Sequence, residues 1–147
     1  MNTTELYFQF LTANKLMQLA TQSEKGLWVC NVYFASDDGG VLYWTSARHR
    51  RHSIEIEANP SVAATIVHDP DKKQAIQIAG RAQRVSLDES AAVHQLYGSK
   101  YGQKESRLEE VMQDTPESRA YWRLDPSLIQ LWDEVNFSDE PKQTVRL

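Results

Sequence analysis

Residues 41–63, VLYWTSARHRRHSIEIEANPSVA, hold the most informative pattern in this sequence of 147 amino acids. An aromatic, strand-like segment passes within a few residues into five consecutive basic side chains, Arg48 to His52. The chain as a whole nevertheless carries a formal net charge of −4. Like charges this close repel one another, so folding alone does not require such a cluster. The basic run is therefore either a solvated surface patch or a binding site for an anion.

The segment 48–58 is predicted to be a helix whose first two turns carry the basic run. Thr45 or Ser46 is a candidate N-cap, and Asn59-Pro60 marks the end, because the residue before a proline is pushed out of the helical region. Each cation near a helix N-terminus destabilises the helix by roughly 0.3 kcal/mol or more, because the helix dipole is positive there. A bound phosphate would reverse this, since both helix N-termini and arginine forks bind anions.

Composition and charge exclude several classes of protein. The chain is 41% hydrophobic and 24% charged, which is typical of a globular fold and excludes a disordered or fibrous chain. The net negative charge counts against a nucleic-acid-binding protein. The one cysteine, Cys30, excludes an internal disulfide and is interpreted as a small buried hydrophobe. There is neither a signal-peptide pattern nor an apolar run of about 18 residues, so we expect a cytoplasmic, membrane-free protein with a single domain, 1–147.

The remaining pattern predicts many short strands and a few helices. Helices are expected at 4–13, 86–101 and 103–113, and strands at 27–35, 41–45, 61–68 and 75–86. Strands and helices do not alternate along the chain, which favours a small β-barrel of the α+β class.

Three local features refine this prediction. The segment 27–35 is nearly all apolar and is expected to be a strand buried on both faces, joined to 41–45 by the turn-forming SDDGG at 36–40. Gly80, in the middle of a strand, suggests a bulge or a bend of the barrel. Asp125-Pro126 is expected to separate two short C-terminal strands.

Several segments together resemble the pyridoxamine 5′-phosphate oxidase-like family of FMN-binding split β-barrels. In residues 41–63, a strand that ends in aromatic residues and Thr leads into a Ser-Arg-His cluster, then a short helix that ends in Asn-Pro. Residues 19–34 look like the paired first strands of that fold. Residues 75–86 are similar to its typical strand ending in a Gly followed by a small residue, and 121–133 follow in the expected order. The resemblance covers most of the chain and implies an antiparallel split β-barrel with peripheral helices.

The resemblance further implies FMN bound at the interface of a homodimer. The implied cofactor-binding residues are Asn31, Thr45, Ser46, Arg50, Arg51, His52, Gln77 and Trp132. The basic residues and the hydroxyls would hold the phosphate, and the two amides would face the polar edge of the ring. Trp132 of the partner subunit would approach the ring; Trp122 is the second candidate for this position. The alternatives are a satisfied core amide for Asn31, a solvent-facing residue for Gln77 and an ordinary core position for the tryptophan.

The implied function is an FMN-dependent oxidoreductase that moves hydride or electrons between bound FMN and a small substrate. No catalytic acid or base is identified. The Arg and His motifs of true pyridoxamine phosphate oxidases are not recognisable near the C-terminus, so that particular reaction is not expected. The alternatives are a deazaflavin-dependent reductase and a flavin- or haem-binding protein without turnover. No metal site is predicted, because His49 and His52 lack a third ligand at a clear spacing.

Overall fold

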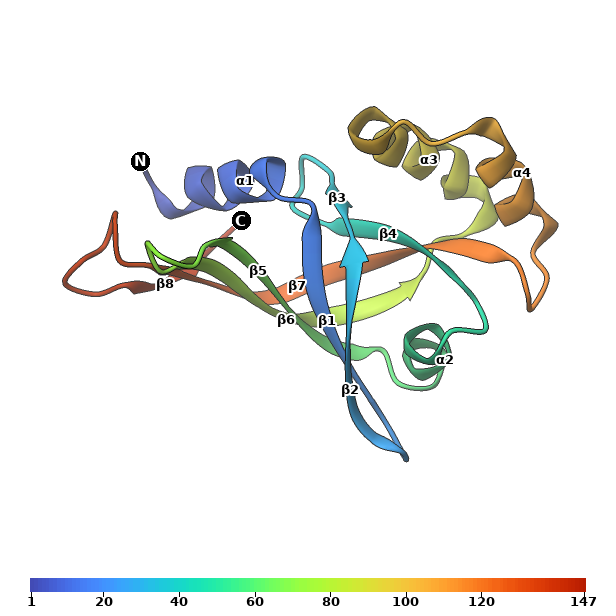
Figure 1. Cartoon of the computed structure of the whole chain (residues 1–147), viewed down its shortest axis with the longest axis horizontal. Helices are drawn as coiled ribbons and strands as arrows, with labels where there is room; N and C mark the ends of the chain where they lie inside the picture. Colours follow the sequence, from blue (N-terminus) through green and yellow to red (C-terminus); the bar gives the residue numbers. More distant parts are fainter.

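The computed structural model describes all residues from 1 to 147 and contains one antiparallel sheet of eight strands. In chain order the elements are α1 (Thr3–Ala13), β1 (Leu16–Ser23), β2 (Gly26–Tyr33), β3 (Ala35–Ser36), β4 (Leu42–Ala47), α2 (Arg51–Ala58), β5 (Ser61–Asp69), β6 (Gln74–Arg84), α3 (Leu87–Tyr101), α4 (Glu105–Gln113), β7 (Arg119–Asp133) and β8 (Lys142–Val145). The strand order is β2-β1-β5-β6-β7-β4-β3, with β8 paired to β7. The sheet curls around its interior (Figure 1), which confirms the predicted antiparallel split β-barrel of the α+β class. None of the four helices has the length and apolar character that a membrane crossing requires.

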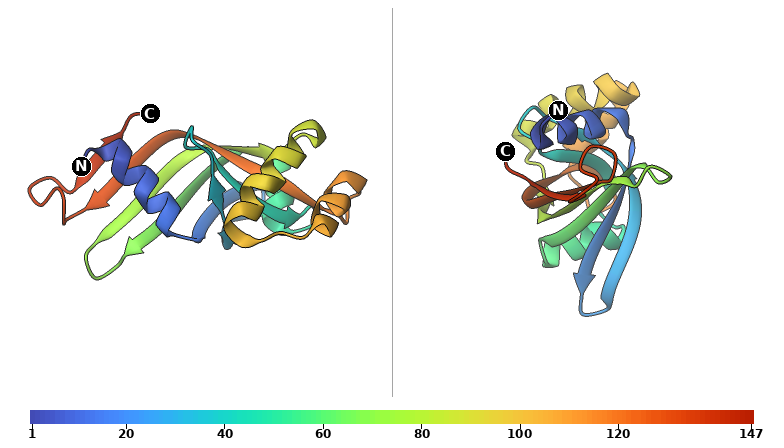
Figure 2. Two further views of the ribbon diagram at one scale, coloured as in Figure 1. Left: turned by 90° about the horizontal axis from the view of Figure 1, so that it is seen from above. Right: turned by 90° about the vertical axis from the view of Figure 1, so that its left-hand side faces the viewer.

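Two apolar clusters hold the elements together. The larger has 23 buried side chains inside the curled sheet, with Trp44, Trp122 and Phe10 among the bulkiest. Helix α1 contributes to this core and contacts β3, β5 and β8 (Figure 2). The smaller cluster fixes α3 and α4 on the other face of β4 and β7, where the rings of Tyr97 and Tyr121 lie 6.0 Å apart. These clusters place α4 beside the ends of β4 and β7.

The expectation of a doubly buried strand at 27–35 is wrong. Strand β2 is the edge strand of the sheet and pairs only with β1, so most of its side chains are exposed, with Leu27 81% and Val29 59% accessible. The predicted hairpin with 41–45 is also made differently. The backbone N–H of Phe34 donates to the Lys15 carbonyl, and after this break the two-residue β3 pairs with β4 across the turn.

The C-terminal half of the sheet also departs from the prediction. Instead of two short strands, β7 is one strand of 15 residues that runs through Asp125-Pro126. The proline is tolerated because it lies opposite Gly80, where the β6–β7 register shifts at a bulge. A side chain at Gly80 would collide with the carbonyl oxygen of Asp125. The predicted bulge at Gly80 is therefore confirmed, and strand β8 is an element that the sequence did not indicate.

The basic run is divided between a turn and a helix. Helix α2 begins at Arg51 rather than at 48, its N-cap is Arg50, and no side chain caps it. Thr45 and Ser46 belong to β4 and are not caps, because strand pairing with β7 already uses their backbone. Residues 48–50 therefore form a tight turn between β4 and α2, which changes the direction of each basic side chain.

Candidate anion-binding cleft

A cleft of about 340 Å³ lies where β2, β4, the start of α2, α3, α4 and the start of β7 meet. Its lining residues are Asn31, Val32, Tyr33, Thr45, Ser46, Ala47, Arg50, His52, Tyr97, Gln103, Arg107 and Arg119. Five of the eight residues predicted from the sequence are in this set, namely Asn31, Thr45, Ser46, Arg50 and His52. We call this space the basic cleft, because it has arginine side chains on its wall and no acidic ones.

The basic cleft carries positive charge that the protein does not neutralise. Arg107 is paired with Glu110, whose Oε1 accepts from its Nη1 at 3.1 Å. Arg50 and Arg119 have no ion-pair partner, although Arg119 donates to the Thr45 carbonyl at 3.2 Å. Burial, followed by the charge of Arg107, lowers the pKa of Arg119 from its usual value. Both cations are therefore free to bind an anion: Arg50 is exposed at the mouth of the cleft, and Arg119 is partly buried, so its charge is less well solvated and would be stabilised most by an anion.

Two polar atoms on the wall of the basic cleft are buried and make no hydrogen bond. They are Oγ1 of Thr45 and Nε of Arg107. A buried donor without a partner costs about 1–3 kcal/mol, so such atoms usually have a ligand or water as partner. Both can donate to the oxygens of a phosphate or carboxylate. The residues present therefore fit an anionic group such as the phosphate of FMN.

His52 extends the polar wall of the cleft from the first turn of α2. Its Nε2 lies 2.8 Å from Oγ of Ser46, at the end of β4. Burial, and then the nearby charge of Arg50, lower the pKa of His52, while Glu55 acts in the opposite direction. This shift favours the neutral ring, which can hydrogen-bond the Ser46 hydroxyl without adding another positive charge.

Arg51, which the sequence also placed at the phosphate, lies outside the basic cleft. Its Nε donates to Oε2 of Glu55 at 3.0 Å, and its guanidinium lies 4.4 Å from the ring centre of Trp28. The same carboxylate is buried and accepts from the hydroxyls of Thr21 and Ser23, each at 2.6 Å. Arg51 therefore ties α2 to the β1–β2 hairpin, and it lines a separate groove together with His49.

The two remaining predicted residues lie on the sheet. Gln77 is exposed in β6, and Trp132 is partly buried in β7; neither lines the basic cleft of this chain. Strand pairing places Gln77 in a polar row that crosses five strands: Asn31, Gln18, Thr65, Gln77 and Gln130. Asn31 is exposed at the end of this row and accepts from Gln18 Nε2 at 2.9 Å, so it is not a buried core amide. Trp122 is fully buried and donates to the Ser46 carbonyl at 3.0 Å.

Seven of the twelve residues that line the basic cleft were not predicted from the sequence. Three of them lie close to predicted residues in the sequence, and the other four come from later segments of the chain: Tyr97, Gln103, Arg107 and Arg119. The two arginines stand singly in the sequence, next to glutamate and serine residues that suggest ordinary solvated surface. The fold brings them within reach of the β4–α2 turn, more than 50 residues earlier in the chain. No local pattern could have identified them.

Comparison with known proteins agrees with this architecture. Among curated proteins, none matches the chain at a significant level. Solved structures with a similar fold include a heme-binding protein from Mycobacterium smegmatis, with 19% identity and a TM-score of 0.72 over 89% of this chain and 54% of that one. A FAD-binding protein from Mesorhizobium loti has 16% identity and a TM-score of 0.65 over 88% and 90% of the two chains. An F420 reductase has 24% identity and a TM-score of 0.62 over 84% and 94%.

These identities are low, so the three structures support the fold and not a particular ligand. The sequence itself is matched by the family described as pyridoxamine 5′-phosphate oxidase over residues 3–133. That range includes β4, the basic run and every residue of the basic cleft. The chain therefore belongs to the pyridoxamine 5′-phosphate oxidase family.

Proposed function

We propose that this protein is a flavoprotein that binds FMN with its phosphate in the basic cleft. The observation that carries this proposal is the pair of unpaired arginines, Arg50 and Arg119, in a cleft with no acidic side chain. A phosphate monoester carries about −1.5 to −2 charges at pH 7, which matches two unpaired cations. Arginine forks bind such oxygens in pairs, so the geometry suits a terminal phosphate.

Within this proposal the residues have distinct roles. Arg50 and Arg119 hold the phosphate oxygens, and Thr45 Oγ1 and Arg107 Nε supply the two buried groups that need partners. Asn31, at the β2 side of the cleft, faces the polar edge of the ring. Bound FMN would supply hydride and electron transfer, and the chain would supply binding and orientation. We assign Arg51 to the structural contact with Glu55 and not to the ligand.

We also propose that the protein is a homodimer in which residues 1–147 act as one unit. The side of the sheet that faces away from the larger core is covered by α3 and α4 only over β3, β4 and the first half of β7. The rest carries the polar row and, next to it, Val29, Ala20, Ala63, Ala79 and Leu128. We call this the uncovered face. Exposed apolar surface of this kind is typical of an interface, and Val29 and Leu128 are 59% and 54% accessible. A second copy on this face would supply Gln77 and Trp132 to the cleft of its partner.

The family and the fold also suit two other ligands. The cations of the cleft would accept the propionates of haem or the acidic tail of a deazaflavin, and similar folds include a heme-binding protein and an F420 reductase. FMN remains our proposal, because the cleft offers phosphate-binding groups and its one histidine is hydrogen-bonded to Ser46.

The test is a binding titration with FMN, riboflavin, F420 and haemin, followed by absorption spectroscopy and by the reduction of bound FMN with NADH or NADPH. We expect FMN to bind about a hundredfold more tightly than riboflavin, which lacks the phosphate. Equal affinity for FMN and riboflavin would show that the phosphate makes no contribution to binding and does not occupy the basic cleft. Tighter binding of haemin or F420 than of FMN would identify that molecule as the ligand in place of FMN. If FMN binds but is not reduced by either donor, the protein would be a flavin-binding protein without turnover.

A further inference from the structure

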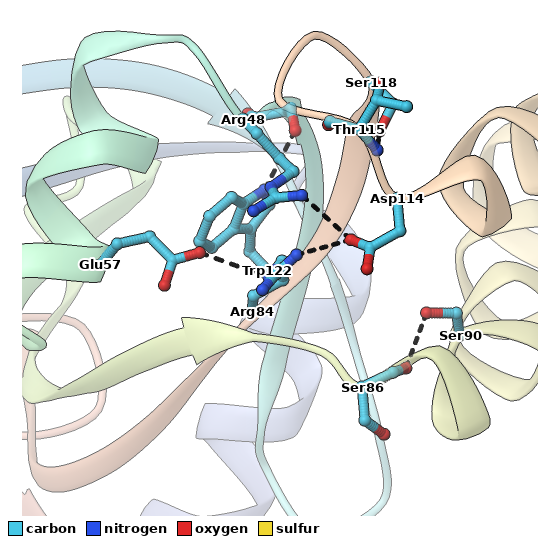
Figure 3. A network of polar contacts seen from close by, with 10 residues as sticks. Arg48, Glu57, Arg84, Ser86, Ser90, Asp114, Thr115, Ser118 and Trp122 are labelled. Atoms are coloured by element: carbon cyan, nitrogen blue, oxygen red, sulfur yellow. Dashed lines mark hydrogen bonds and ion pairs between the residues drawn. The ribbon is translucent and has the colours of Figure 1, made fainter.

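Asp114, outside the basic cleft, joins the segments that carry its arginines. It is the C-cap of α4 with φ 52°, and its Oδ1 accepts from Arg48 Nη1 at 3.0 Å and from Arg84 Nη1 at 2.7 Å. Figure 3 shows both contacts and the ion pair of 3.3 Å between Arg84 and Glu57. One carboxylate thus connects the end of α4 to the β4–α2 turn and to the end of β6, and through Arg84 to α2.

Arg48 links this network to both unpaired cations of the cleft. It lies two residues before Arg50, in the same tight turn, and its backbone N–H donates to the Ser118 carbonyl at 3.0 Å. Ser118 directly precedes Arg119. This bond continues the β4–β7 pairing, in which Ala47 lies opposite Arg119, into the turn that carries Arg50, so Arg48 connects the two segments at the point where regular strand pairing ends.

Such a connection is needed because the cleft arginines repel one another. Arg107 and Arg50 both act on Arg119, and the opposing carboxylate of Glu110, which pairs with Arg107 and accepts from the Arg119 backbone N–H at 2.7 Å, lies outside the cleft lining. A carboxylate inside the cleft would compete with an anionic ligand. Asp114 does not line the cleft, so it can hold the turn in place while Arg50 and Arg119 stay available to the ligand.

We infer that Asp114 is a positioning residue that acts through Arg48 to hold Arg50 and Arg119 at the separation a phosphate needs. This inference rests on the proposed function, because it assigns the basic cleft to a phosphate. It adds a residue that touches neither the ligand nor the cleft wall and that no sequence pattern connects to the basic run.

The decisive variant is Asp114→Asn. Asparagine tolerates the left-handed backbone of this helix end, so the fold should be retained while the charge on both arginine contacts is lost. The contacts are partly exposed, so we expect FMN affinity to fall by about five- to tenfold and riboflavin affinity to stay unchanged. Asp125→Asn is the matched control, because Asp125 pairs with Arg123 away from the cleft and its loss should not change either affinity.

A double-mutant cycle with Arg48→Met tests the route of the effect. If Asp114 acts through Arg48, Asp114→Asn in the Arg48→Met background should weaken FMN binding by less than about twofold. Wild-type FMN affinity in Asp114→Asn, equal losses for FMN and riboflavin, or additive losses in the cycle would each overturn the inference.

A second measurement separates this inference from the proposed function. In the ligand-free protein, the side-chain Nε–Hε resonances of Arg50 and Arg119 should shift or broaden in Asp114→Asn and remain unchanged in Asp125→Asn. If wild type does not bind FMN but these resonances respond, the proposed function fails and the positioning role of Asp114 stands. If the resonances do not respond, the positioning role is overturned whether or not FMN binds.

Discussion

At the scale of single residues, the five basic side chains from Arg48 to His52 have five different environments. Arg48 pairs with Asp114, Arg51 pairs with Glu55, and His52 contacts Ser46. His49 is exposed, and Arg50 alone both lines the basic cleft and lacks an acidic partner. The local excess of positive charge is therefore mostly neutralised within the fold, and one arginine of the run remains for a ligand.

The first prediction separates the two adjacent arginines. Arg50→Met should weaken FMN binding by at least about tenfold, because it removes one of the two unpaired cations of the cleft. Arg51→Met should change FMN affinity by less than about twofold and instead lower the free energy of unfolding, because Glu55 loses a partner. Isothermal titration calorimetry and urea unfolding on both variants would check this. A larger loss of affinity in Arg51→Met would restore Arg51 as a phosphate ligand.

The second prediction concerns acid stability. The hydroxyls of Ser23 and Thr21, and with them Arg51, lower the pKa of Glu55 from 4.5 to about 2. Because the pKa is lower in the folded protein, this carboxylate contributes stability above pH 4.5, and the contribution is lost as the pH falls towards 2. In Glu55→Gln, the slope of unfolding free energy against pH in this window should be smaller by about one bound proton. Urea unfolding at several pH values between 5 and 2, centred on about pH 3.5, measures this slope. An unchanged slope in Glu55→Gln would contradict the assignment of this pH dependence to Glu55.

At the scale of elements, the β6–β7 pair shows how one glycine allows a long strand to pass a proline. Strand β7 pairs with β4 and the end of β6 before Pro126, and with β8 and the start of β6 after it. The bulge at Gly80 absorbs the shift between these halves. The first half carries Arg119 to the basic cleft, and the second half carries Trp132 on the sheet.

The third prediction tests this bulge with two glycine substitutions. Gly80→Ala should lower the free energy of unfolding by about 2–4 kcal/mol, because the new methyl group meets the Asp125 carbonyl. Gly98→Ala, inside α3, should raise it by about 0.5–1 kcal/mol, because its new methyl group meets only ordinary contacts and alanine favours helix. Chemical denaturation of both variants provides the comparison. A Gly80→Ala variant as stable as wild type would show that the bulge relaxes freely.

At the scale of the whole molecule, the uncovered face is the main unexplained surface of the isolated chain. It combines exposed apolar residues with the polar row that ends at Asn31 beside the basic cleft. The apolar character of β2, which led to the expectation of a strand buried on both faces, is consistent with burial against a second copy. In the proposed dimer, dimerisation and ligand binding would be coupled.

The fourth prediction follows from this coupling. Ala63→Glu places a charge in the middle of the uncovered face and should convert the proposed dimer to a monomer while weakening FMN binding. Ala91→Glu, on the exposed side of α3, makes the same chemical change away from that face and should do neither. Sedimentation equilibrium with and without FMN measures both effects. A wild-type protein that is monomeric at high concentration, or an Ala63→Glu variant that stays dimeric, would exclude this interface.

Local patterns in the sequence were sufficient for much of the fold. The turn residues at 36–40 and the Asn59-Pro60 helix end restrict the backbone by their own stereochemistry, so their effects do not depend on distant contacts. The same holds for the position of Ser46 and Arg50 near the cleft, because the strand and the turn that carry them adjoin in the chain. Gly80 could be recognised as a break in its strand, but the carbonyl that requires a glycine there belongs to Asp125 of β7.

The tertiary structure decided which of these residues share a site. Arg107 and Arg119 join Arg50 only because α4 and β7 pack beside β4, while Arg51 leaves the site because its helix turns it towards Glu55. A sequence pattern records the residue types but not the carboxylates that reach them from other segments. The sequence therefore determined where the positive charge of this protein is concentrated, and the packing of distant elements decided which arginines remain unpaired and available for an anion.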